Sequence, residues 1–561
     1  MERLFKTHYI RNQEELTGKY WDFVPWEGEK ASEVQRFMTP CCWETHPGFE
    51  NYRGKAEFST SFYAKGNIRL LFKGVSHTAT VFLDGAEITS HYNAYTPFEV
   101  CANDLADGAH SLKVLVDNGF GEDSALHVPN DYQTYGGIIR PVYLENIFTS
   151  YIRYCHVTTV RKGEGWTVKL SVCLKNVKGG KDSFVLKIKA AGSEIKPVEV
   201  CLDAFEERVV YAETECTGVS LWSEECPALY FAECELEKNG TAFDDLRERF
   251  GFREVSIKGR DILMNGKKLF IKGFCRHEDH PMFGCALPLE AMAGDIELLK
   301  ELGANSVRTS HYPNDDRSLD LCDERGILVW EENHARGLSE EQMKNPNFEL
   351  QAEDCIREMI TAHFNHPSIY IWGILNECAS DSEYGRECYK KQYDLIAELD
   401  PTRPRSSASC KFKTDICLGL PEVVSYNIYP QWYHDTPVRE YLDDLHEWVE
   451  KDTQGAGKPF LITETGAGAI YGNRDVRHAK WSEEYQAEAL EKQLTAVLSS
   501  PYCSGVYIWQ FCDVRISDEW WYSRPRTMNN KGVVDEYRRP KLSFETVKRI
   551  FKEYSRNADR A

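Results

Sequence analysis

Several features are missing from this sequence, and each absence excludes a class of protein. No run of 18 apolar residues without a charge occurs, which excludes a membrane-spanning helix. The opening stretch, MERLFKTHYIRNQEEL, lacks the apolar core of a signal peptide, so we do not expect secretion. No C-x-x-C pair occurs among the 19 cysteines, so zinc-binding and dithiol redox motifs have no support.

Positive charge is also in short supply. The chain has 67 Lys and Arg against 88 Asp and Glu, which gives a formal net charge of −21. Such a surplus repels phosphate backbones and anionic lipids, so we expect no nucleic-acid or membrane partner. The cysteines are odd in number and scattered along the chain, which is typical of reduced thiols. Together with the lack of a signal peptide, they predict a cytoplasmic protein.

The 561 residues are too many for one hydrophobic core, and the first half has the pattern of β-structure. From about residue 58 to 147, short alternating segments are separated by turn signals, for example Asp84-Gly85 in TATVFLDGAEI. Residues 150 to 242 repeat this pattern over a length that suits a seven-strand immunoglobulin-like module. The sequence therefore predicts two successive β-sandwiches.

After Gly251, apolar strand-like runs alternate with helical patterns. A stripe of apolar residues from Leu289 to Leu302, followed by Gly303, predicts a helix between the first two strands. Eight strands alternating with helices indicate a TIM barrel, in which chemistry gathers at the carboxyl ends of the strands. The eight candidate strands cover residues 269–274, 306–311, 327–332, 369–377, 405–409, 423–429, 459–465 and 505–511.

Two of these strands end in glutamate, as IYIWGILNE and PFLITE, at Glu377 and Glu464. A carboxylate that closes a buried apolar strand is costly unless it is paired or functional. Two carboxyl groups about 5 Å apart are what a retaining glycosidase requires, one as acid and one as nucleophile. The alternative is that both glutamates only form salt bridges at the barrel rim.

The stretch NHPSIYIWGILNE, ending at Glu377, closely resembles the acid/base signature of glycoside hydrolase family 2. Three further segments of that family occur in order: KGFCRHEDHP, RTSHYP and LITETGAGAIYG. The resemblance implies a multidomain protein with a jelly-roll sugar-binding β-sandwich at 1–149, an immunoglobulin-like β-sandwich at 150–255 and an α/β TIM barrel at 256–561. It implies no organic cofactor and no metal for the leading function.

The resemblance also implies roles for individual residues. Glu377 would be the general acid/base, with a raised pKa, and Glu464 the nucleophile, ionised in the free enzyme. Asn376 would hydrogen-bond the sugar 2-hydroxyl. His277 and His311 match positions near the bound sugar, although each can also be a structural histidine.

The segment RPRTMNNKGVVDEYRRPK indicates which sugar is bound. Its Asn529 and Lys531 fit the N-x-K pattern by which β-glucuronidases of this family hold the C6 carboxylate of the sugar, whereas a solvated lysine is the alternative. Further residues match substrate-lining positions of the glucuronidases or form an aromatic platform for the sugar ring: Asp131, Asn427, Tyr429, Trp432, Tyr433 and Trp509.

Arg336 lies in the short loop after the third strand. We expect it to be solvated; the alternative is contact with the substrate carboxylate or with an axial 4-hydroxyl, which would favour galacturonides.

These observations favour a β-uronidase acting on a carbohydrate substrate, with glucuronide ahead of galacturonide only on frequency within the family. A β-galactosidase is the main alternative, in which Glu332 and Glu278 would hold metal ions. A non-catalytic carbohydrate-binding protein is a remote alternative, because both glutamates are present. By analogy with relatives we expect a homo-oligomer.

Overall fold

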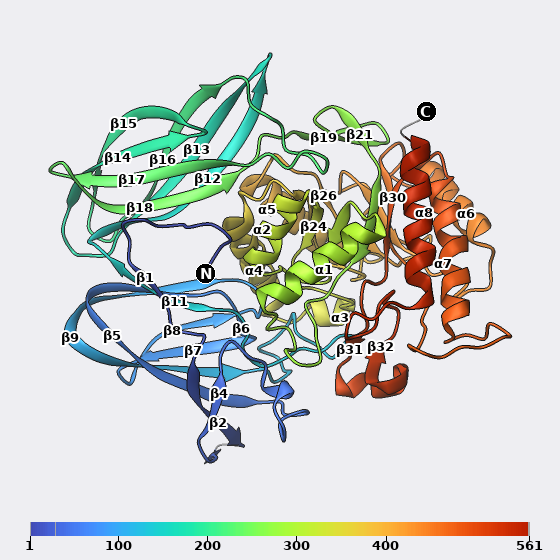
Figure 1. The fold of residues 1–561 in the computed structure, drawn as a ribbon, viewed down its shortest axis with the longest axis horizontal. Helices are drawn as coiled ribbons and strands as arrows, with labels where there is room; N and C mark the ends of the chain where they lie inside the picture. Colours follow the sequence, from blue (N-terminus) through green and yellow to red (C-terminus); the bar gives the residue numbers. More distant parts are fainter. Residues whose placement is uncertain (1, 29, 559–561) are drawn as a thin grey trace.

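The computed structural model describes residues 2–28 and 30–558. Two β-sandwiches lie one above the other on one side of the molecule, and the α/β barrel forms the other side (Figure 1). Among the described residues, no helix combines the length and the apolar character needed to cross a membrane.

The first sandwich is built around a nine-stranded antiparallel sheet in which two long strands, β5 and β9, pair along almost their whole length. Asp84 and Gly85 both have positive φ, 49° and 83°, and join β7 to β8 as the predicted two-residue turn. The strands are β1 (Gln13–Glu15), β2 (Tyr20–Glu27), β3 (Lys30–Ala31), β4 (Gln35–Met38), β5 (Lys55–Phe72), β6 (Val75–Ser76), β7 (Thr78–Leu83), β8 (Ala86–Tyr92), β9 (Phe98–Asp117), β10 (Gly137–Ile138) and β11 (Val142–Ile147).

The second sandwich has the seven strands that the sequence predicts, counted over the described residues. A three-stranded sheet, β12-β13-β16, packs on a four-stranded sheet, β15-β14-β17-β18, and alternate side chains of both fill one core. The strands are β12 (Ser150–Lys162), β13 (Gly165–Asn176), β14 (Asp182–Ala190), β15 (Ser193–Leu202), β16 (Glu207–Cys216), β17 (Tyr230–Lys238) and β18 (Thr241–Phe250).

All eight predicted barrel strands form, and they pair in parallel in the order β26-β25-β24-β23-β22-β30-β29-β28-β27. The two ends of this sheet, β26 and β27, are halves of the fifth strand, separated by Ser407, so the sheet closes on itself there. The strands are β22 (Ile271–Cys275), β23 (Ser306–Arg308), β24 (Leu328–Glu332), β25 (Ile369–Gly373), β26 (Arg405–Ser406), β27 (Ala408–Ser409), β28 (Val424–Asn427), β29 (Phe460–Thr465) and β30 (Cys503–Ile508).

Helices cover the outside of the barrel. The predicted stripe on α1 faces inward, with Met292, Ile296, Leu299 and Leu302 buried, and Gly303 ends the helix at φ 82°. The helices are α1 (Leu289–Leu302), α2 (Asp316–Arg325), α3 (Glu340–Met343), α4 (Phe348–His363), α5 (Glu383–Leu399), α6 (Val438–Asp452), α7 (Glu483–Leu498) and α8 (Leu542–Ala558), with 3₁₀ turns at Trp43–Thr45, Asp518–Ser523 and Pro525–Thr527.

Short strands complete the barrel unit: β19 (Val255–Lys258), β20 (Asp261–Met264) and β21 (Lys267–Leu269) form one antiparallel sheet, and β31 (Val514–Arg515) pairs with β32 (Met528–Asn529). We retain the division into units at 1–149, 150–255 and 256–561 as a proposal.

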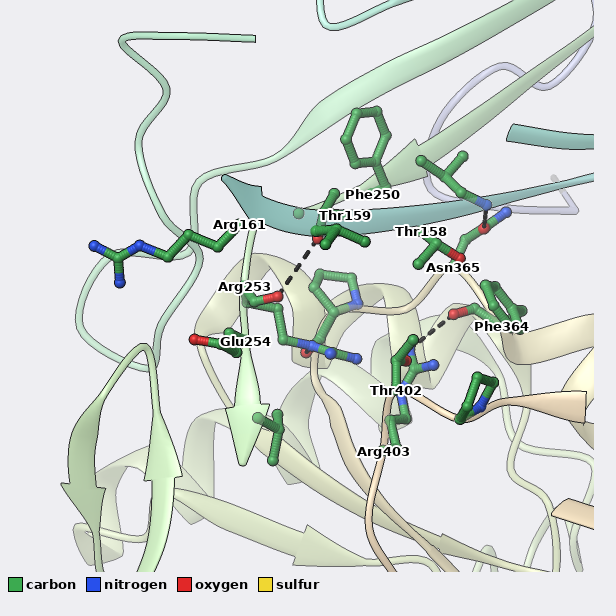
Figure 2. A pocket seen from close by; sticks show the side chains of 16 residues that line it. Thr158, Thr159, Arg161, Phe250, Arg253, Glu254, Phe364, Asn365, Thr402 and Arg403 are labelled. Carbon is green, nitrogen blue, oxygen red and sulfur yellow. Dashed lines mark hydrogen bonds between the residues drawn. The ribbon is translucent and has the colours of Figure 1, made fainter. Parts of the chain in front are cut away.

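Arg253 of the second sandwich contacts the barrel beside a cavity of about 260 Å³, which Arg403 of the barrel also lines (Figure 2). Arg253 donates to the carbonyls of Pro367 and Ile369 at 3.0 Å each, and Arg403 donates to those of Ile369 and Phe364 at 2.8 and 2.7 Å. These carbonyls lie just before and within β25, so the two arginines fix the strand that leads to Glu377.

A second arginine contact joins the two sandwiches through the N-terminal segment. Arg11 donates to Asp244 of β18 at 2.8 Å and to Glu145 of β11 at 3.0 Å, and all three side chains are almost completely buried. Removing one partner of a buried ion pair leaves an uncompensated charge, which costs far more than breaking an exposed pair.

We therefore expect Arg11→Met to lower the free energy of unfolding by about 3–5 kcal/mol. The control is Arg36→Met, because Arg36 pairs with Asp22 at the exposed surface and its loss should cost at most about 1 kcal/mol. Urea unfolding followed by tryptophan fluorescence measures both variants. Equal losses would show that the buried contact does not join the sandwiches.

Candidate active site

The carboxyl ends of the barrel strands open into a cavity of about 220 Å³ that holds most of the predicted site residues. Segments far apart in the sequence meet here, because parallel strands bring their carboxyl ends to one edge. The lining residues that the sequence predicts are Asp131, Arg336, Glu377, Asn427, Tyr429, Tyr433, Glu464, Trp509 and Lys531; those that it misses are Cys410, His434, Tyr441 and Arg524.

Glu464, in β29, is held at both carboxylate oxygens. Arg308 donates to Oε1 at 2.8 Å and the Tyr429 hydroxyl donates to Oε2 at 2.5 Å. Burial raises the pKa of Glu464 to about 7, the nearby Glu377 carboxylate adds to this rise, and Arg308 and Tyr429 oppose it. Burial and a like charge therefore outweigh the two donors, and the ionised state of Glu464 in the free enzyme stays a prediction.

Glu377 follows β25 on a strained stretch of backbone. Leu375 and Glu377 have φ of 46° and 54°, a left-handed backbone conformation that residues other than glycine seldom adopt. The Glu377 N–H donates to the Ala408 carbonyl at 2.9 Å, and Asn427 donates from Nδ2 to Glu377 Oε1, also at 2.9 Å. These bonds aim the Glu377 carboxylate into the cavity toward Glu464.

Arg308, which is completely buried at the end of β23, links the two glutamate strands. Besides Glu464, it donates to Asn376 Oδ1 at 2.7 Å and to both oxygens of Glu332 at 3.0 Å. The Asn376 Nδ2 atom is buried and has no partner among the described residues. Because Arg308 fixes the carbonyl side of this amide, Asn376 presents free N–H donors.

The two predicted histidines do not line the cavity; both are buried against Trp509, which does, and both are held through Nδ1. His277 bonds the Tyr312 hydroxyl at 3.2 Å, and His311 bonds Glu332 at 2.8 Å while its ring stacks 5.0 Å from that of Trp509. Burial lowers the pKa of both imidazoles, so they are neutral. Both Nε2 atoms are buried without a partner in the described residues, which leaves them for a ligand.

Positive charge gathers at one part of the cavity. Lys531 is 3% exposed, and burial lowers its pKa. Its ammonium lies 5.3 Å from the Tyr433 ring centre, and Arg524 approaches the Tyr433 hydroxyl at 3.3 Å. Asn529 donates to Asp131 at 3.2 Å, and its own Oδ1 has no partner among the described atoms. Lys531 is therefore not a solvated lysine.

Arg336 does not project into solvent as expected. Its guanidinium contacts Asp131 at 3.1 Å, Glu377 at 3.5 Å and the Asn130 amide oxygen at 2.5 Å. Burial opposes ionisation of Asp131, but Arg336, Arg524 and Lys531 outweigh it and lower the pKa of Asp131 to about 2. The expectation of a solvated Arg336 is wrong because Asn130 and Asp131, which bury it, belong to the first sandwich. The sequence of the barrel loop alone gives no sign of these contacts.

The two groups of metal-type side chains found in the described residues lie outside this cavity, at Glu2, His8 and Glu145 and at Asp320, Asp323 and His366. Each already contains an arginine partner, Arg11 for Glu145 and Arg3 for Asp320. The arrangement in the cavity is instead a pair of carboxyl groups, one cationic end and several polar atoms without partners, which suits a small polyhydroxylated anion.

The chain is similar to known glycoside hydrolases. The family model for glycosyl hydrolases family 2, TIM barrel domain, matches residues 255–555, and another model of glycosyl hydrolases family 2 matches residues 150–253. The fold is similar to the crystal structure of a GH2 beta-galacturonidase from Eisenbergiella tayi bound to galacturonate, with a TM-score of 0.97 and 58% identity over 99% of each chain.

More distant relatives differ in their named activity. A putative beta-glucuronidase from Formosa agariphila is 28% identical over 87% of this chain and 61% of its own length. A beta-galactosidase from Thermoanaerobacterium thermosulfurigenes is 30% identical over 86% of this chain and 66% of its own length. The chain thus spans slightly less than two thirds of these two relatives. With a family model covering more than half of its residues, the chain belongs to glycosyl hydrolase family 2.

Proposed function

We propose that this protein is a retaining exo-β-glycosidase that releases a terminal β-linked uronic acid, with galacturonides ahead of glucuronides. The observation that carries this proposal is the buried Lys531, which lines the same cavity as Glu377 and Glu464. A buried ammonium with no carboxylate within 4.0 Å among the described residues is costly unless a ligand supplies the negative charge.

The reaction would proceed by double displacement. Glu464 attacks the anomeric carbon and forms a covalent glycosyl ester, while Glu377 gives its proton to the departing glycosidic oxygen. Glu377 then takes a proton from water, whose oxygen attacks the anomeric carbon and releases Glu464. The free N–H donors of Asn376 would hold the sugar 2-hydroxyl, and the neutral Nε2 atoms of the two buried histidines would bind further hydroxyls.

Lys531, Asn529 and Arg524 would bind the C6 carboxylate. The ammonium supplies a compact charge, and the guanidinium supplies several donors in one plane. Trp509, stacked on His311, would support the sugar ring from the side. Asp131, held by Arg336 and Asn529, would accept a hydrogen bond from a sugar hydroxyl.

Galacturonide takes precedence over glucuronide because the 58% identical structure is named a beta-galacturonidase and is bound to galacturonate. The sequence favours glucuronide only on its frequency within the family. Arg336 offers a physical reason: it lies between Asp131 and Glu377, where a guanidinium can donate to an axial 4-hydroxyl.

A β-galactosidase remains the second candidate, since one relative carries that name. The residues that would hold its metal ions are already engaged. Glu332 accepts hydrogen bonds from Arg308, His311 and Trp330, and Glu278 accepts one from Arg140 at 2.9 Å. A neutral sugar would also leave the Lys531 charge without a partner.

We also propose that the protein acts in a reducing cytoplasm as a homo-oligomer. All 19 cysteines are free thiols in the structure, which supports the first part. The second part rests on analogy with relatives.

The first experiment compares Lys531→Ala with the native protein on p-nitrophenyl β-galacturonide, β-glucuronide and β-galactoside. We expect the variant to lose about 100-fold or more in kcat/KM on the preferred uronide, the effect of removing a buried charge partner, and little on the galactoside. Lys492→Ala, an exposed lysine on α7, is the control and should behave like the native protein. A native preference for the galactoside would make the protein a neutral-sugar enzyme.

The acid role of Glu377 predicts a dependence on the leaving group. Glu377→Gln removes the transferable proton while keeping the side-chain size, so substrates with poor leaving groups should slow by about 100-fold or more relative to activated aryl glycosides. Initial rates on a series of aryl uronides of increasing phenol pKa measure this slope. An equal loss on every substrate would show that Glu377 is not the acid.

The raised pKa of Glu464, about 7, predicts how kcat/KM varies with pH. Because Glu377 and Glu464 interact, their protons belong to the pair, and the singly protonated pair includes the active form with Glu464 ionised and Glu377 protonated. The pair loses that proton as the pH rises through about 7, so kcat/KM should fall on the alkaline side. Glu377→Gln, assayed on an activated aryl uronide, should lack this alkaline limb. A native profile that rises through pH 7 would contradict the assignment.

A further inference from the structure

The cavity extends beyond the residues assigned to the uronic acid. Cys410, His434 and Tyr441 line the same space as Glu377, and the proposed function gives none of them a role. Tyr441 lies in the first turns of α6, His434 in the loop between β28 and α6, and Cys410 directly after β27. We call these three residues, together with Phe412, the aromatic wall.

The aromatic wall begins next to the proposed acid. The Glu377 N–H donates to the Ala408 carbonyl, and Cys410 follows two residues later in the same strand end. Cys410 is exposed and lines the same cavity as Glu377. An acid that protonates the glycosidic oxygen must face the leaving group, so the leaving group passes beside this wall.

The wall presents flat rings. Tyr441 is half-buried, and its ring lies 4.8 Å from that of Phe412 and 5.6 Å from that of His434, the latter nearly parallel at 22°. Phe412 is 36% exposed and His434 is exposed. Rings held by one another in this way lose little freedom when a ligand stacks on them, and their faces suit the C–H face of a sugar or a phenolic ring.

The charge around the wall differs from that at the uronate end. The two lysines flanking Phe412 are each neutralised, Lys411 by Asp381 at 3.3 Å and Lys413 by Asp444 at 2.6 Å. Lys531, by contrast, is buried and has no such acidic partner among the residues that the structure describes. The wall therefore offers ring surface without spare positive charge, which disfavours a second uronic acid.

We propose that the aromatic wall is the subsite for the leaving group and that it selects a flat, uncharged ring, either a neutral sugar or a phenol. This inference rests on the proposed function for the identity of the acid and of the sugar. Substrates with a methyl leaving group would not reach the wall.

The test compares Tyr441→Ala with the native protein on three glycosides of the preferred uronic acid: the methyl glycoside, the p-nitrophenyl glycoside and a disaccharide with a neutral sugar as leaving group. We expect kcat/KM to fall about 5- to 10-fold on at least one of the two ring-bearing substrates and less than about 2-fold on the methyl glycoside. Tyr441→Phe, which keeps the ring, should retain the kcat/KM that Tyr441→Ala loses. Which ring-bearing substrate is affected identifies phenol or sugar as the partner.

Tyr502→Ala is the matched control, because Tyr502 is also half-buried and stacks on a histidine, His446, at 3.8 Å, but does not line the cavity. A loss shared by all three substrates, or by none, would overturn the wall as a leaving-group subsite. A uronosyl-uronate cleaved faster than the neutral disaccharide would overturn its preference for uncharged rings. If the native enzyme prefers galactosides, the proposed function fails, and the same comparison on galactosides still tests the wall.

Discussion

The burial of the Arg308 guanidinium is the constraint on which the rest of this site depends. A charge with no exposed surface must be paired by neighbours in the protein, and here Glu332 and Glu464 share that task while Asn376 accepts a further bond. The three partners come from three different barrel strands or strand ends. Satisfying one cation therefore fixes the proposed nucleophile and the proposed 2-hydroxyl donor in one rigid arrangement.

The surroundings of Arg308 also explain why the pKa of Glu464 is raised. One guanidinium serves two carboxylates, and Glu377 adds a third negative group near them. Arg336 compensates only in part, because it is shared with Asp131. Where buried acidic groups outnumber nearby cations, the pKa of a carboxyl group is higher than in water. A retaining glycosidase needs a protonated carboxyl group to protonate its leaving group.

The sequence predicts most of the fold and the centre of the site, because these depend on local patterns along the chain. Contacts between segments that are far apart in the sequence leave no such pattern and are not predicted. The barrel strands are apolar runs that end at one edge, so Glu377 and Glu464 can be placed together from periodicity and order. Arg336 was misjudged and Arg524 was missed, because no local pattern marks them. Arg336 is buried by contacts with Asn130 and Asp131 from the first sandwich, and Arg524 lies between two irregular 3₁₀ turns.

The first sandwich contributes the Asp131 carboxylate to the site, and this carboxylate holds segments of the barrel in place. Asp131 accepts contacts from Arg336 at 3.1 Å, Arg524 at 3.4 Å and Asn529 at 3.2 Å. One carboxylate of the sandwich therefore orders two segments of the barrel, the loop after β24 and the connection from β30 to α8. These segments carry the proposed uronate and 4-hydroxyl contacts. Because a hydrogen bond to a buried hydroxyl depends on sub-ångström placement, the proposed preference between epimeric uronic acids would depend on how the sandwich and the barrel pack together.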